Sequence, residues 1–304
     1  MKTLFVLIFG FLTLAAAASG QSGQSNATGP QSGPQSTGPQ SAGPQSNVPQ
    51  AAGANPASAP AAGAAQPASV DDNARKARHL VEQSIQALGG KAYLNFFDMK
   101  QQGRGFGFYR NESKGVGVPY TRLYQFPDKE RYEYFRDAAW VIIHNGDKGY
   151  ETTFHGTHEE DPKDLKEYLR RSQFALDRIL RGWASDPKTA FFFDGQTIAE
   201  TRQVYKITLV NAQNQPVTLF LNTQTLLPVK RTFTWRDTET KEVNEESELY
   251  DNYRLVQGIS TPYLITRTMN GEMVSQRFLR TVIYNVGVGD AVFQPAAVKL
   301  SQKK

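Results

Sequence analysis

The residues of this chain best suited to metal or acid–base chemistry lie in one segment, HGTHEED at residues 155–161. His155 and His158 could bind zinc, with Glu159 or Glu160 as a third ligand. Zinc hydrolases place such histidines on a helix with the glutamate in a fixed register. Here the segment precedes a predicted helix, so we predict an exposed polar loop, with no metal and no other cofactor. A metal-dependent hydrolase at His155 and His158 is the minor alternative.

Nucleophilic and paired-carboxylate chemistry has no candidate residues. The chain contains no cysteine and no Gly-x-Ser-x-Gly segment. Glu245 and Glu246 are neighbours in a predicted strand, so their side chains point to opposite faces. The glycines at 103, 105 and 107 lie within the predicted strand 99–108, and the next predicted element is another strand, whereas a phosphate-binding loop lies between a strand and a helix. They predict a bend in a curved sheet. We therefore predict no catalytic residues and no enzyme.

Aromatic residues flank a tight turn at Pro127-Asp128-Lys129. Proline followed by aspartate suits the middle of a common turn, and both flanking runs have the period of two of a strand. The sequence predicts an antiparallel hairpin whose two faces both carry rings, which indicates a sheet that is packed on one side and faces a partly apolar space on the other. The rings are Tyr120, Tyr124, Phe126, Tyr132, Tyr134 and Phe135.

Two amphipathic helices and a series of strands must position these residues. Helical spacing of apolar residues predicts helices over 71–88 and over 161–183, the second beginning with Asp161 as its cap and Pro162 in its first turn. Alternation and turn residues predict a meandering antiparallel sheet. Its strands are expected at 99–108, 120–126, 132–135, 140–144, 150–154, 190–193, 203–211, 217–222, 229–236, 243–253, 263–269 and 274–284.

The beginning of the chain differs from the rest in composition. Residues 1–19 have the charged start, short apolar run and small residues of a secretory signal peptide. Residues 20–70, rich in Gln, Ser, Gly, Pro and Ala, predict a disordered linker, followed by one domain at 71–298 and a tail at 299–304. We expect a periplasmic protein, with full secretion as the alternative, and no membrane span in the mature chain.

The formal net charge of +5 is small and its sign is mixed along the chain. Basic residues alternate with acids, as in Arg236-Asp237 and Lys241-Glu242. No basic stripe of the kind that follows a phosphate backbone is present. We therefore expect no nucleic acid among the partners.

Several short segments, taken in order, resemble the outer-membrane lipoprotein carrier superfamily (LolA-like). The resemblance extends over almost all of residues 71–295. Its segments are Ala87-Leu88-Gly89-Gly90, Phe126-Pro127-Asp128-Lys129 with Arg131, Asn145-Gly146-Asp147 before Gly149-Tyr150, Leu221-Asn222 through Leu227-Pro228, Tyr250-Asp251-Asn252-Tyr253-Arg254 with Gly258 and Pro262, and Asn285 through Phe293-Gln294-Pro295.

The resemblance implies an α+β fold, a curved antiparallel sheet forming an incomplete barrel, with helices packed on its concave side. It implies a non-enzymatic carrier in outer-membrane biogenesis that shelters acyl chains of a lipid or lipoprotein, with inner- or outer-membrane envelope proteins as further partners. Helix 161–183 becomes the lid. In the carriers an arginine before the hairpin proline holds the lid, whereas here that position is Phe126.

The resemblance also suggests which residues line the cavity, although plain core packing is the alternative for each ring. An envelope scaffold with a filled core, whose linker recruits partners, is the alternative function. The cavity candidates are Tyr120, Tyr124, Tyr132, Tyr134, Trp140, Leu176, Ile179 and Trp183.

Overall fold

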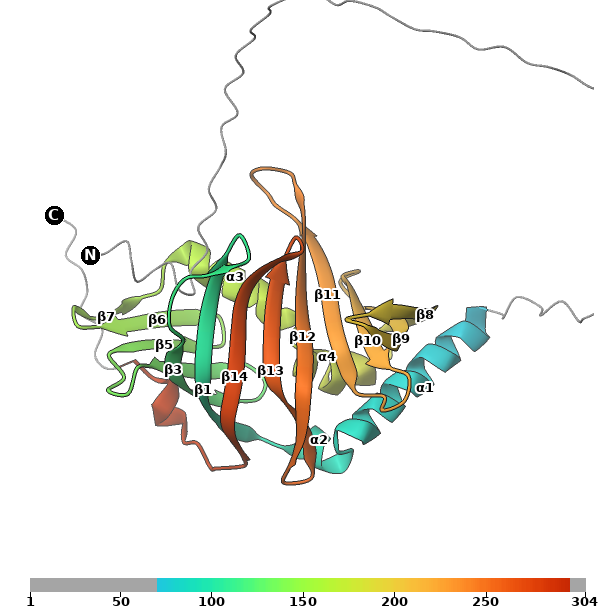
Figure 1. The fold of residues 1–304 in the computed structure, drawn as a ribbon, viewed down its shortest axis with the longest axis horizontal. Coiled ribbons are helices and arrows are strands. Elements are labelled where there is room, and N and C mark those ends of the chain that lie inside the picture. Colours follow the sequence, from blue (N-terminus) through green and yellow to red (C-terminus); the bar gives the residue numbers. More distant parts are fainter. Residues whose placement is uncertain (1–69, 296–304) are drawn as a thin grey trace, which may run out of the picture. The chain divides into compact units, whose positions relative to one another are not determined.

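The computed structural model describes residues 70–295, so the predicted signal peptide, linker and tail lie outside the described residues. These residues form one antiparallel sheet of 14 strands together with short and medium helices (Figure 1). The strands are β1 (Asp98–Tyr109), β2 (Glu112–Ser113), β3 (Val118–Gln125), β4 (Lys129–Tyr134), β5 (Trp140–Asn145), β6 (Lys148–Thr153), β7 (Gly156–Glu159), β8 (Ala190–Ala199), β9 (Arg202–Val210), β10 (Pro216–Asn222), β11 (Pro228–Arg236), β12 (Val243–Val256), β13 (Ile259–Met269) and β14 (Glu272–Tyr284).

The helices lie at the beginning of the described chain, in its middle and at its end. They are α1 (Val70–Leu88), α2 (Lys91–Asn95), α3 (Pro162–Gln173), α4 (Leu176–Arg181), and the 3₁₀ turns η2 (Trp183–Ser185) and η3 (Asp290–Phe293). Among residues 70–295 we find no helix that is both long enough and apolar enough to cross a membrane.

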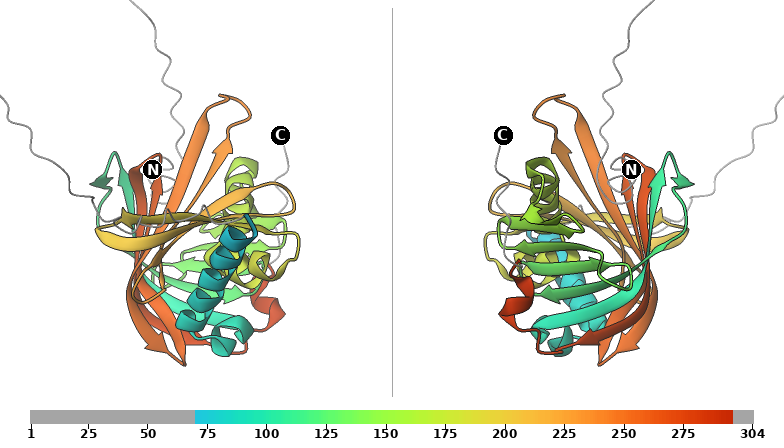
Figure 2. Two further views of the ribbon diagram at one scale, coloured as in Figure 1. Left: turned by 90° about the vertical axis from the view of Figure 1, so that its right-hand side faces the viewer. Right: turned by 90° about the vertical axis from the view of Figure 1, so that its left-hand side faces the viewer.

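The strand order is β7-β6-β5-β4-β3-β1-β14-β13-β12-β11-β10-β9-β8, with β2 beside β1. Neighbours in this order are neighbours in sequence except at β1 and β14, which join the early strands to the late ones. The sheet curls without closing, and Figures 1 and 2 show α1, α3 and α4 on its concave side. The predicted fold class is therefore confirmed.

The aromatic hairpin pairs as its sequence predicts. In the β3–β4 register Tyr120 lies opposite Tyr134, Arg122 opposite Tyr132, and Tyr124 opposite Glu130. Paired residues share a face, so this face of the hairpin carries an arginine and a glutamate among its rings.

The predicted helix over 161–183 is two helices joined by a bend. Asp161 caps α3 as expected, since its carboxylate accepts a hydrogen bond from the Lys163 backbone N–H. Phe174 and Ala175 then leave the helix, and the buried Phe174 ring stacks on Phe233 with 4.1 Å between centroids. The helical spacing of the apolar residues does not predict the bend, because the spacing continues through it. The short elements α2, β2, β7 and η3 were not predicted.

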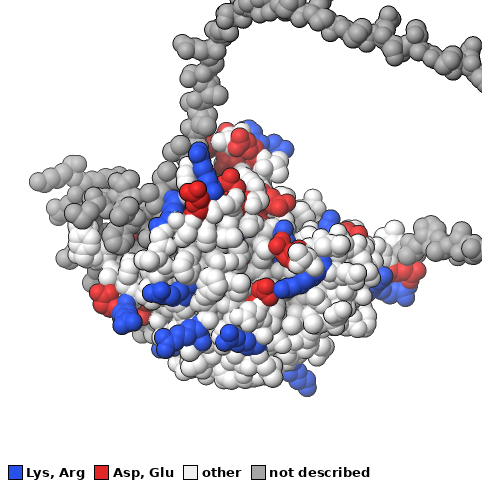
Figure 3. Space-filling view, viewed as in Figure 1, with Lys and Arg blue, Asp and Glu red and all other residues white. Residues whose placement is uncertain are grey.

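The main apolar core lies between the concave face and the helices. Side chains of α1 such as Val81 and Leu88 are buried with Leu219 and Phe233 of the sheet and with Ile179 of α4. On the opposite, outward face, single acidic and basic side chains are separated by uncharged surface (Figure 3). The helices therefore cover the apolar side of the sheet and leave its mixed side outside.

Candidate functional site

A cavity of about 340 Å³ lies on the concave side of the sheet. One wall comes from β3, β4 and β5, a second from β11 to β14, and α3 with α4 forms the third. It lies beside the main core and has both aromatic and charged side chains on its walls. Volumes of this size are typical of sites for small ligands.

The aromatic wall is a row of neighbouring rings from the predicted hairpin and the next strand. The Tyr132 ring lies 5.8 Å from that of Tyr120 and stacks on that of Tyr134 at 5.6 Å between centroids. Tyr134 in turn stacks on Trp140 at 4.6 Å. This row gives the cavity a flat aromatic surface. Burial raises the pKa of Tyr120 to about 12, so its hydroxyl stays neutral at ordinary pH.

Six of the eight cavity candidates line this space, and two do not. Ile179 is fully buried in the main core, and Trp183 packs edge-on against Phe174, with 5.5 Å between ring centroids. The structure thus assigns both to packing between the helices and the sheet. The candidates that line the cavity are Tyr120, Tyr124, Tyr132, Tyr134, Trp140 and Leu176. That they hold a ligand stays a prediction.

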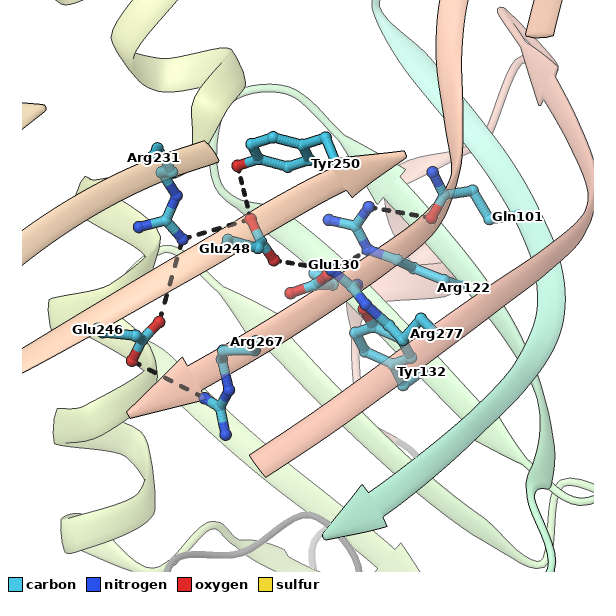
Figure 4. Close-up of polar contacts among 10 residues, drawn as sticks. All are labelled: Gln101, Arg122, Glu130, Tyr132, Arg231, Glu246, Glu248, Tyr250, Arg267 and Arg277. Atoms are coloured by element: carbon cyan, nitrogen blue, oxygen red, sulfur yellow. Dashed lines mark hydrogen bonds and ion pairs between the residues drawn. The ribbon is translucent and has the colours of Figure 1, made fainter. Parts of the chain in front are cut away.

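The cavity is not lined by apolar residues alone, as a simple shelter for acyl chains would require. Glu248 of β12 lies at the centre of a buried polar network (Figure 4). Its carboxylate accepts a hydrogen bond from Tyr250 Oη at 2.8 Å and lies 3.0 Å from Arg277 Nη2 and 3.4 Å from Arg231 Nη2. Arg277 also donates from Nη1 to Tyr132 Oη at 2.7 Å, which links the network to the aromatic wall.

A second ion pair lies on the hairpin itself. Arg122 of β3 pairs with Glu130 of β4 and donates from Nη1 to Gln101 Oε1 at 3.3 Å. Its guanidinium carbon lies 4.7 Å from the Tyr124 ring centroid. The pair places charged groups beside the rings of Tyr124 and Tyr132.

The network shifts the proton affinities of its members. Burial alone would raise the pKa of Glu248, but Arg231 and Arg277 outweigh it and lower this pKa to about 2. Burial, together with the neighbouring Arg171, lowers the pKa of Arg267 to about 10. Glu248 and the arginines therefore remain charged at neutral pH.

These charged residues were not predicted from the sequence, although their spacing along β12 indicates that some of them share a face. Glu246, Glu248 and Tyr250 alternate along β12, so all three point to the same face of the strand. Glu246 is buried and Glu245 exposed, as the expected opposite orientation of these neighbours requires. Arg231 and Arg267 lie on β11 and β13, the strands directly before and after β12, and Arg277 lies on β14. Which of their residues meet Glu248 depends on the register of the strands.

The histidine segment forms an edge strand, and its His158 side chain lies near a carboxylate. Residues 156–159 form β7, a correction to the predicted loop. His158 Nε2 lies 3.5 Å from Glu151, while His144, which looked isolated in the sequence, pairs with Glu160 at 2.9 Å and stacks on Tyr168. Within residues 70–295 no three His, Cys, Asp or Glu side chains gather in a way that could hold a metal ion.

Helix α4 is held to the hairpin by Arg181. Its guanidinium carbon lies 3.7 Å from the ring centroid of Phe126 and 4.3 Å from that of Phe96. Nη2 also donates to the Phe96 carbonyl at 2.8 Å. The resemblance implies an arginine before the hairpin proline. In this chain the helix supplies the arginine of the contact, Arg181, and the hairpin supplies the ring of Phe126.

No protein-family model matches the chain, and no curated protein matches it in sequence. Among solved structures, a DUF1329 family protein from Desulfovibrio piger is 11% identical with a TM-score of 0.51, covering 73% of this chain and 97% of that one. A putative outer-membrane lipoprotein-sorting protein domain from Vibrio parahaemolyticus is 13% identical with a TM-score of 0.49, covering 73% and 97%. A LolA superfamily protein from Nitrosomonas europaea is 12% identical with a TM-score of 0.45, covering 72% and 97%.

At these identities the likeness concerns the fold. The structure from Desulfovibrio piger shares this fold over 97% of its own chain. A LolA superfamily protein and a lipoprotein-sorting domain, which the sequence resemblance led us to expect, are among the matched structures.

Proposed function

We propose that this chain is a non-enzymatic binding or carrier protein of the bacterial envelope, which shelters acyl chains of a lipid or lipoprotein in its half-barrel. The observation that carries the proposal is the cavity of about 340 Å³ with its continuous aromatic wall. A sheet whose concave side is filled by side chains would leave no such space. Each methylene taken out of water on binding would contribute about 0.8 kcal/mol.

The proposed location is the periplasm, and the proposed partners include proteins of the inner or outer membrane. The apolar start of the sequence and the absence of cysteine support export without a disulfide or acylated cysteine. The shared fold with a lipoprotein-sorting domain is consistent with an envelope role. The charged centre of the cavity makes an amphiphile, with one polar group, a better ligand than a pure hydrocarbon.

The proposal is tested by the lipid content of the full-length chain purified from a bacterial envelope. Native mass spectrometry should show added mass that disappears on denaturation, and mass spectrometry of an organic extract should identify an acyl lipid. A protein that neither carries lipid nor takes it up from added vesicles would contradict the proposal and favour a scaffold.

Two residues of α4 give a matched pair of variants. Leu176 lines the cavity and is partly exposed, whereas Ile179 on the same helix is fully buried and does not line it. We expect Leu176→Ala to weaken lipid uptake with a small loss of stability. Ile179→Ala should cost about 2 to 5 kcal/mol of unfolding free energy and leave uptake by the folded protein unchanged. Equal effects of both variants on uptake would place the ligand elsewhere.

A further inference from the structure

Positive charge exceeds negative charge in the buried network of the cavity. The ion-paired members shown in Figure 4 are four arginines and three glutamates. The helices that face the network add Arg171 and Arg178 against Asp164, Glu167 and Asp177, so the positive excess belongs to the network on the sheet and not to the cavity as a whole.

The arginines of the sheet lie in one row across adjacent strands. Arg231 of β11 is opposite Glu248 of β12, Glu248 is opposite Arg267 of β13, and Arg267 is opposite Ser275 of β14. Neighbouring strands are about 4.8 Å apart, so these side chains form a compact group. Arg277 lies two residues beyond Ser275 on β14, opposite Ile265, and contacts the same Glu248 carboxylate. All of these residues line the cavity.

Arg231 uses only part of its hydrogen-bonding capacity within this group. Its side chain is 2% exposed, and its Nη2 lies 3.4 Å from Glu248 and 4.0 Å from Glu246. The Tyr250 side chain also interacts with this guanidinium. Nε and Nη1 have no hydrogen-bond partner among the described residues. A buried N–H group without an acceptor destabilises the fold. The planar guanidinium fork matches the two oxygens of a carboxylate or phosphate.

The aromatic wall leads away from this group. Tyr132 accepts the hydrogen bond of Arg277 and begins the row that continues through Tyr134 to Trp140. The opposite part of the cavity carries acids, Glu151 and Glu160 among them. An amphiphile would therefore meet positive charge at one end of the cavity, rings along its length and negative charge at the far end.

We propose that Arg231, Arg267 and Arg277 form a subsite for the anionic oxygen group, carboxylate or phosphate, of an acyl amphiphile whose chain lies along the row of rings. This inference rests on the proposed function and narrows the ligand class to anionic lipids. The anion supplies acceptors to the unused Arg231 donors and balances the excess charge.

Titration calorimetry of the full chain with four probes tests the subsite. Dodecanoate and dodecyl phosphate carry a chain and an anionic group, dodecanol carries the chain alone, and inorganic phosphate carries the anion alone. Below micellar concentrations we expect both anionic amphiphiles to bind at least about tenfold more tightly than dodecanol, the equivalent of one charged hydrogen bond. Inorganic phosphate should bind more weakly than dodecyl phosphate by at least the same factor.

The other outcomes separate the two proposals. Equal affinity for dodecanol and dodecanoate overturns the subsite and leaves the proposed carrier function standing. Failure of every chain-bearing probe to bind overturns both. Inorganic phosphate binding as tightly as dodecyl phosphate overturns the lipid subsite in favour of a site for free anions.

A variant with a matched control completes the test. Arg231→Met should reduce the affinity for both anionic amphiphiles about tenfold and leave that for dodecanol unchanged. Arg202→Met removes an exposed arginine, paired with Asp251 outside the cavity, and should change neither affinity. If Arg231→Met does not fold, Arg267→Met gives the same test. Retention of the anionic preference in a folded variant would overturn the subsite.

Discussion

Glu248 is a buried carboxylate that depends on three neighbours. Its side chain is 14% exposed and receives Arg231, Arg277 and the Tyr250 hydroxyl. Taking a carboxylate out of water costs several kcal/mol, which close partners offset. The same contacts make the stability of the fold depend on pH, because they act on the charged form of Glu248.

At the scale of this residue, Glu248→Gln should remove an acid-sensitive part of the stability. The folded pKa of about 2 lies below the ordinary value of 4.5. The charged form therefore stabilises the fold above pH 4.5, and this contribution, about 3 kcal/mol, is lost as the pH falls toward 2. The variant should be ~3 to 5 kcal/mol less stable at pH 7, since it leaves arginines uncompensated. The difference from the natural chain should narrow below pH 4.5.

Urea unfolding at a series of pH values measures this difference. Glu245→Gln, at an exposed position of the same strand, is the control and should change stability little at any pH. Stability curves for Glu248→Gln and the natural chain that run parallel through the acid range would contradict the assigned role of Glu248.

The aromatic part of the site could be predicted from the sequence and the charged part could not. The rings of the hairpin face one another across a single tight turn, so local pattern fixes their pairing. Arg231, Glu248 and Arg277 come from three strands, and their contact depends on the order of strands in the sheet. Alternation fixes the face of a side chain but not its neighbours across the sheet.

At the scale of elements, helix α4 is short and relies on tertiary contacts. Helix α4 spans six residues, too few to be stable on its own in water. Ile179 and Leu180 bury its inner face, and Arg181 joins it to the rings of Phe96 and Phe126. Guanidinium groups over rings contribute about 0.5 to 2 kcal/mol each, so Arg181 controls how easily α4 leaves the sheet.

Arg181→Met should loosen α4 without disturbing the sheet. It removes both ring contacts of the guanidinium and the hydrogen bond to the Phe96 carbonyl. We expect the opening free energy of α4 to fall by about 1 to 3 kcal/mol, and amide hydrogen exchange over Leu176–Arg181 to become at least about fivefold faster. Arg178→Met, a change on the same helix away from these rings, is the control. Unchanged hydrogen exchange in Arg181→Met would show that the apolar contacts alone keep α4 packed on the sheet.

Most helices and strands were predicted from the sequence. The exceptions depend on contacts with other elements. Strands bounded by Asn-Gly turns and the capped start of α3 lie close to their predicted positions. Strand β8 continues past its predicted end at residue 193, through Asp194-Gly195 to Ala199, with a register irregularity there. The bend at Phe174 and the short strand β7 do not follow from local pattern. Phe174 leaves the helix where its ring meets Phe233, and β7 exists because it pairs with β6.

At the scale of the whole sheet, one strand pair holds the two cavity walls together. The β1–β14 pair connects two groups of strands, the group from β3 to β7 beside β1 and the group from β13 to β8 beside β14. Gln101 and Arg122 belong to the first side and Glu248 to the second, while Arg277 lies on β14 at the junction. Any change that separates β1 from β14 should therefore open the cavity as well as weaken the fold.

Gly103→Ala tests this dependence. A Cβ at Gly103 would overlap the Phe278 carbonyl oxygen and lie 3.1 Å from Leu279 Cα, at the irregular register between Gln102 and Gly103. Backbone atoms cannot yield as a flexible side chain can, so we expect a loss of at least about 1 to 3 kcal/mol of unfolding free energy together with weaker lipid uptake. Gly289→Ala adds the same methyl group where nothing lies within 4 Å and should be close to neutral. Calorimetric unfolding and lipid uptake are measured on the same samples. A destabilised Gly103→Ala protein whose folded fraction takes up lipid normally would show that the cavity does not depend on the β1–β14 strand pair.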